Sequence, residues 1–131
     1  MSSLKKEAPS PGSGKRERYI QPSILMGLYR RASYGYELIQ TMGEYGFIEG
    51  TAPPGMIYRH LRQLEEDGLV VSRWQTEGAG PAKRIYTLTA DGRDLLSLWI
   101  DHMAEQAEKL QRFVAYYRQA VAEAEQAGST G

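Results

Sequence analysis

Two arginines, three residues apart, are the side chains of this sequence best suited to bind a polyanion. Arg59 and Arg62 lie in the segment "TAPPGMIYRHLRQLEEDGLV", which covers residues 51–70. A guanidinium group can bond a guanine edge or a phosphate, provided that its helix is anchored on another face. At 100° per residue the opposite face of this segment is apolar and holds Ile57, Leu61 and Leu64. We therefore expect a helix that presents arginine to a partner.

The residues at the head of this helix favour close approach by that partner. Pro53 or Pro54 suits a first helical turn, where a missing N–H costs nothing. Gly55 leaves the turn without a side chain, so that a phosphate could approach the N–H groups and the helix dipole. Tyr58 falls between the two faces, and either packs in the core or places its hydroxyl on a phosphate. Gln63 lies at the margin of the arginine face.

A second basic pair follows at the edge of a glycine-rich loop. The runs "LVVSRWQ" and "KRIYTLT" are β-branched and aromatic, and "TEGAGPA" separates them, which predicts a β-hairpin. Lys83 and Arg84 stand where the loop ends, so the hairpin resembles a wing with at least one side chain on a flanking phosphate. Trp74, at the end of the first strand, is expected to pack.

The elements before this segment would have to support it. Residues 19–32 and 33–47 predict two short helices, with Ser33 as a cap of the second and Gly43 and Gly46 at its end. Residues 19–90 are then a winged helix-turn-helix domain. Residues 1–18 are rich in Pro, Gly, Ser and Lys and predict a disordered basic arm. That arm is either a solubilising tail or a contact to DNA backbone.

The last helix is predicted over residues 91–125, capped by Thr89 or Asp91 and followed by a disordered tail at 126–131. Its apolar residues advance by alternating steps of four and three, the 3.5-residue repeat of paired helices. The expected homodimer seam consists of Leu96, Ile100, Met103, Leu110, Val114, Tyr117 and Val121. Trp99 and Met103 are either part of the dimer core or line a pocket for an effector.

Composition excludes several classes of function. The formal net charge is zero, but residues 1–31 hold seven basic and two acidic residues, an asymmetry that the total hides. There is no cysteine and there are only two histidines, so we expect no catalytic constellation, metal site or cofactor. No apolar run approaches the roughly 20 residues of a membrane span, and no secretory signal is apparent. A cytoplasmic, non-enzymatic protein without membrane contact is expected.

Three motifs, in order, resemble those of the PadR family of bacterial transcriptional regulators. They are "YGYEL" at 34–38, "GMIYRHLRQLEEDGLV" at 55–70 and "GPAKRIYTLTADG" at 80–92. The resemblance extends from about Tyr19 to Tyr117. Tyr34 replaces the usual His and Arg59 the usual Pro, so the family's base preference does not carry over. The stretch "SRWQTEGAGPAKRIYTLTADG" with Trp99 also resembles the family's polyhydroxybutyrate-responsive repressors.

The resemblance implies a mainly α fold with a small β-hairpin, a winged helix-turn-helix followed by a long C-terminal dimerisation helix. It implies a regulator that binds double-stranded DNA at an inverted repeat, most often as a repressor, and is released by a small apolar or storage-polymer effector. One alternative is a winged-helix protein-interaction module without specific DNA binding. Another is contact with an apolar polymer through the long helix in addition to DNA binding.

Overall fold

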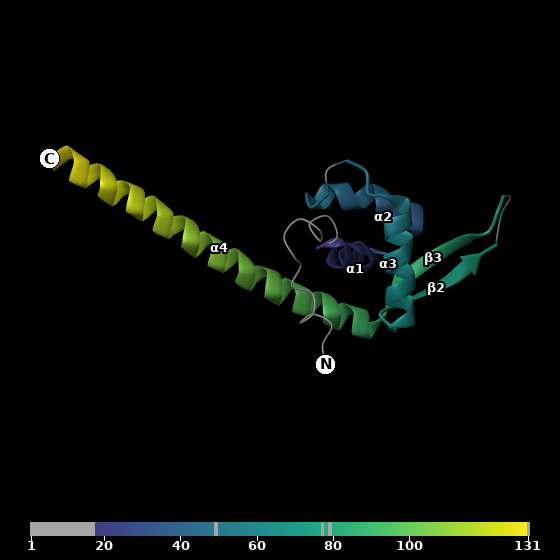
Figure 1. Cartoon of the computed structure of the whole chain (residues 1–131). Helices are drawn as coiled ribbons and strands as arrows, with labels where there is room; N and C mark the ends of the chain where they lie inside the picture. The colour runs from purple at the N-terminus through teal and green to yellow at the C-terminus, as the bar shows by residue number, and fades with distance from the viewer. Residues whose placement is uncertain (1–17, 49, 77, 79, 131) are drawn as a thin grey trace. The chain divides into compact units, whose positions relative to one another are not determined.

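The computed structural model describes residues 18–130 except 49, 77 and 79 (Figure 1). It divides into two compact units, Met1–Leu96 and Ser97–Gly131. Nearly all of the proposed basic arm at 1–18 lies outside the described residues. None of the described helices is long and apolar enough to cross a membrane.

The described residues of the first unit up to position 89 form three α-helices, a 3₁₀ turn and a small sheet. Its helical elements are α1 (Ile20–Arg30), α2 (Gly35–Met42), the 3₁₀ turn η2 (Gly43–Tyr45) and α3 (Pro54–Glu66). Figure 1 shows α3 between α1 and the β2–β3 hairpin, and α3 packs against α1, α2 and β2. Gly46 has a φ of 84°, a left-handed conformation that ends the second helical segment where the sequence predicted.

The sheet has three strands, one more than the sequence predicted. Strands β2 (Val70–Gln75) and β3 (Lys83–Leu88) form the expected antiparallel hairpin. The additional strand β1 (Ser33–Tyr34) pairs with the other side of β3, which gives the order β1-β3-β2. Ser33 therefore belongs to a strand rather than capping α2, because its backbone is drawn into the ladder opposite Tyr86.

An aliphatic core holds the three helices and the base of the hairpin together. Ile57, Leu61 and Leu64 of α3 have no exposed surface, as their helical spacing predicted. They belong to the set of described side chains with less than 2% exposure, which also contains Ile20, Ile24, Leu25, Leu38, Met42 and Val70. Ile57, Leu61 and Leu64 bury one face of α3, which leaves the opposite face for contact with a partner.

The last helix, α4 (Ala90–Thr130), is 41 residues long, or roughly 60 Å at 1.5 Å per residue. Its N-terminus is capped as predicted, because the Gly92 N–H donates to Thr89 Oγ1 at 3.0 Å. The helix continues past residue 125, so residues 126–130 of the predicted tail are helical. The alanine, glutamate and glutamine in "AEAEQA" favour helix and extend it. The expected fold class, mainly α with a small β-hairpin and a long C-terminal helix, is confirmed, and the role of that helix in a dimer stays a prediction.

Candidate nucleic-acid interface

The outward face of α3 carries every side chain that the sequence predicted there. Six predicted contact residues on this helix are exposed: Pro54, Gly55, Tyr58, Arg59, Arg62 and Gln63. Gln63 Nε2 donates to both carboxylate oxygens of Asp67, at 3.3 and 3.4 Å, and is held at the helix margin. The face is thus basic at its centre and polar at its edge.

The head of α3 is open. Pro53 is its N-cap residue and Pro54 begins the helix, as expected from the proline pair. A Cβ atom added to Gly55 would meet no atom within 4 Å, so the glycine leaves free space in front of the first turn. A partner could reach the backbone here without displacing any side chain.

Tyr58 joins α3 to the start of α2. A Cβ atom on Gly35 would fall within 2.8 Å of both Cζ and Oη of the tyrosine, and closer still to Cε1. The ring therefore lies directly on the Gly35 backbone, while the side chain remains 40% exposed. The ring therefore packs on Gly35 while part of the side chain stays at the surface, and a contact of the hydroxyl with a phosphate stays a prediction.

The Lys83 side chain lies on the same face of the sheet as Tyr34 of β1. The rings of Tyr34 and Tyr36 are stacked, with centroids 5.7 Å apart. The Lys83 ammonium sits 5.6 Å from the first centroid and 5.8 Å from the second. Tyr34 Oη also donates to Gln75 Oε1 at 2.5 Å. These contacts hold an exposed cation in place without neutralising its charge.

Arg84 lies on the other face of the hairpin and has partners that the sequence did not reveal. Its Nη2 is 3.4 Å from Glu65 Oε1, and its Nε donates to Ser72 Oγ at 2.8 Å. The guanidinium also lies 5.4 Å from the Trp74 ring centroid. Trp74 was expected to pack, but it is 61% exposed and its ring contacts Arg84 rather than the core. It is at the outer part of the strand, beyond the reach of the core.

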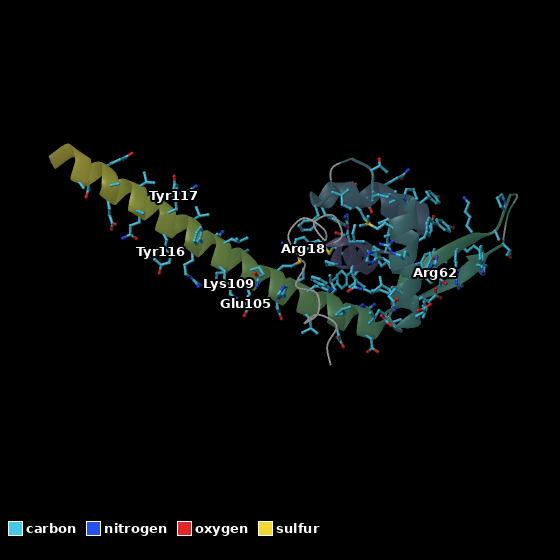
Figure 2. All side chains as sticks on the ribbon, viewed as in Figure 1. Arg18, Arg62, Glu105, Lys109, Tyr116 and Tyr117 are labelled. Carbon is cyan, nitrogen blue, oxygen red and sulfur yellow. The ribbon has the colours of Figure 1, made fainter. Side chains whose placement is uncertain are left out.

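Tyr86 marks where α3 and the hairpin meet. It is 5% exposed, and burial raises the pKa of its phenol, while the charge of the nearby Arg84 opposes that shift. Arg62 also acts on this phenol from α3. Figure 2 shows Arg62 on α3 beside the strands. Arg62 of α3 and Tyr86 of the hairpin are therefore near each other within the first unit.

The predicted seam residues lie on α4. Leu96, in the first unit, is buried. In the second unit Ile100, Leu110, Val114, Tyr117 and Val121 are exposed in the single chain, and Met103 is half-buried. Trp99 is only 4% exposed, and its ring lies edge-on to His102 at 6.3 Å. Among the described residues, no group of three or more His, Cys, Asp or Glu side chains could hold a metal ion.

Comparison with known proteins identifies relatives that match more than half of the chain. Residues 24–98 match the family described as the transcriptional regulator PadR-like family. The transcriptional regulator YqjI of Escherichia coli is 33% identical over 105 residues, which cover 76% of this chain and 47% of that protein. This chain spans less than half the length of the curated relatives it matches, 41% and 47%.

Two solved structures resemble the fold. Bacillus subtilis PadR in complex with operator DNA has a TM-score of 0.56 and 28% identity, over 63% of this chain and 47% of that chain. A PadR family transcription regulator from Clostridium difficile has a TM-score of 0.65 and 24% identity. That match covers 73% of this chain and 98% of the other. The second likeness supports the fold, and the first concerns a relative solved on its operator.

Proposed function

This chain belongs to the transcriptional regulator PadR-like family, and from that premise we propose that it binds double-stranded DNA sequence-specifically to regulate transcription in the cytoplasm. The observation that carries the proposal is the exposed basic face of α3, on a helix that is anchored by three buried aliphatic residues and joined to the hairpin by the Glu65–Arg84 ion pair. A helix of this kind fits the major groove, and a hairpin beside it reaches the adjacent backbone.

The side chains of this surface differ in the contacts that they offer to DNA. Arg59 and Arg62 read base edges or grip phosphate from the centre of α3. Pro54 and Gly55 let the helix end approach the backbone, and Tyr58 and Gln63 flank the arginines. Lys83 places a positive charge on phosphate from the wing. At least one of the two wing cations serves this purpose.

Salt dependence is the direct test of DNA binding. The full chain is titrated with a random-sequence duplex and with a duplex that it selects from a random pool, from 50 to 300 mM salt. Contacts to phosphate release counterions, so the logarithm of affinity should fall linearly with the logarithm of salt concentration. The selected duplex should bind more tightly at every salt concentration. If neither duplex binds at low salt, the protein-interaction module becomes the better explanation.

We further propose that the protein acts as a homodimer through α4. Leu110, Phe113 and Tyr117 are 67%, 73% and 66% exposed in the single chain, at the 3.5-residue spacing of a helix seam or beside it. Figure 2 shows Tyr116 and Tyr117 as side chains on this helix. Two copies would present their α3 helices to half-sites about one DNA turn, ~34 Å, apart. An inverted-repeat operator follows from that symmetry.

An apolar effector acting near Trp99 and Met103 would release the DNA from a repressor of this kind. Because Trp99 is almost fully buried, a ligand reaches it only if the side chains that cover it move. The test follows Trp99 fluorescence in Trp74→Phe protein during titration with hydroxybutyrate oligomers, phenolic acids and cationic dyes. If a compound dissociates the operator while Trp99 emission stays constant and Trp99→Ala responds normally, the effector acts elsewhere.

A further inference from the structure

Three polar side chains from three elements meet where the hairpin leaves α3. Glu65 is on α3, Ser72 on β2 and Arg84 on β3. Ser72 Oγ donates to Glu65 Oε2 at 2.7 Å and accepts from Arg84 Nε at 2.8 Å. Arg84 Nη2 closes the ring on Glu65 Oε1 at 3.4 Å. Each member bonds both others, so the position of every side chain depends on the other two.

Two aromatic rings lie next to the Arg84 guanidinium. It lies 5.4 Å from the Trp74 centroid and 5.9 Å from the Tyr86 centroid. The strand register places Trp74 opposite Arg84 and Ser72 opposite Tyr86. Because directly opposed residues share a face of an antiparallel pair, all four lie on one face of the hairpin. The guanidinium thus has two aromatic neighbours in addition to its hydrogen bonds to Ser72 and Glu65.

The two wing cations are therefore in different electrostatic positions. The Glu65 carboxylate compensates the charge of Arg84, and the Arg84 side chain is 44% exposed in that pair. Lys83 is on the opposite face of the hairpin, against two neutral tyrosine rings. Within the described residues Lys83 forms no ion pair. Lys83 could neutralise a phosphate and release the cations condensed on the DNA, whereas Arg84 would first have to leave Glu65.

We infer that Glu65, Ser72 and Arg84 form a brace that fixes the wing relative to α3, and that Arg84 is a positioning residue rather than a phosphate contact. The inference rests on the proposed DNA binding. A braced wing holds Lys83 at a set distance from Arg59 and Arg62. The two arginines can then contact the groove while Lys83 contacts the DNA backbone, and the wing does not have to be ordered on binding. Loss of the brace would add an ordering cost to each binding event.

Removal of the acid gives the sharpest test, because electrostatics and positioning predict opposite signs. Taking a carboxylate from a DNA-binding face should strengthen binding if only charge matters. If the brace positions the wing, Glu65→Ala should weaken binding to the selected duplex, by about three- to tenfold for one charge-assisted contact. Glu66→Ala is the matched control, because Glu66 is the next residue of α3, is exposed, and forms no ion pair within the described residues. It should leave binding unchanged or slightly tighter.

Arg84 variants then separate position from charge. Arg84→Gln should weaken binding about as much as Glu65→Ala without changing the salt slope, and the double variant should be no weaker than either single variant. Arg84→Lys restores the charge but not the paired hydrogen bonds, so it should not recover affinity. Lys83→Gln, in contrast, should lower the salt slope by about 0.9. Thermal unfolding of each variant confirms that it is folded at the assay temperature.

Opposite results would overturn the brace. Tighter binding by Glu65→Ala, with a salt slope lowered by about 0.9 in Arg84→Gln and full recovery in Arg84→Lys, would make Arg84 an ordinary phosphate contact. That outcome would leave the proposed function intact. Failure of the wild-type protein to bind either duplex would instead remove the proposed function itself, so the two failures are distinguishable.

Discussion

Replacement of Gly35 by alanine tests how α2 and α3 are joined beneath the proposed DNA surface. The added Cβ would fall within 2.8 Å of Cζ and Oη of Tyr58, well inside normal contact distance. Either the ring swings away or the two helices separate. Overpacking of this kind costs about 1–3 kcal/mol of unfolding free energy, and the better helix propensity of alanine recovers at most about 1 kcal/mol of it.

The matched substitution is Gly55→Ala at the head of α3. Its Cβ would have no atom within 4 Å, and a smaller unfolded-state entropy should stabilise the fold by about 0.4–1 kcal/mol. The same methyl group would occupy the space through which DNA approaches the helix end. Gly35→Ala should therefore lower stability, while Gly55→Ala should keep or raise stability and weaken DNA binding.

Both variants are compared by urea and thermal unfolding at one protein concentration, since a dimer's stability depends on concentration. A loss of 1 kcal/mol lowers the midpoint by roughly 4–8 °C in a domain of 60–100 residues. Repeating Gly35→Ala in a Tyr58→Ala background isolates the clash, and there its cost should shrink to near zero. Equal costs of Gly35→Ala in the two backgrounds would show that the ring does not lie on the glycine.

Four further predictions follow from the same surface and helix. Arg62→Ala should reduce affinity for the selected duplex by about 1–3 kcal/mol if it pairs with a base, and equal losses on random duplex would mean that it holds phosphate instead. Lys83→Ala should weaken all duplexes alike and lower the salt slope by about one; an unchanged slope would refute a wing contact. Leu110→Asp places a charge in the proposed seam and should halve the mass measured by light scattering. A wild-type protein that is itself monomeric would refute the seam. Burial raises the pKa of Tyr86, so the unfolded chain loses the phenol proton at a lower pH than the folded chain does. The free energy of unfolding should therefore fall as the pH rises above about 10, and Tyr86→Phe should reduce that fall.

The sequence alone was sufficient for those features that depend on neighbours along the chain. The faces of α3 follow from helical periodicity, so burial of Ile57, Leu61 and Leu64 could be predicted and is confirmed. The hairpin followed from two β-rich runs around a glycine-rich loop. The family motifs, read in order, indicated the fold and the class of regulator. In each case the physical cause is a repeat or a turn that acts over a few residues.

Only the tertiary structure decided which side chains meet across elements. Strand β1 is two residues long and exists because β3 offers it a free edge, which local sequence does not encode. Tyr58 was ambiguous by spacing, and its place is set by the bare backbone of Gly35 on another helix. Lys83 and Arg84 are adjacent in sequence and identical in charge, yet the alternation of a strand sends them to opposite faces. One then meets two tyrosine rings and the other the carboxylate of Glu65, 19 residues earlier.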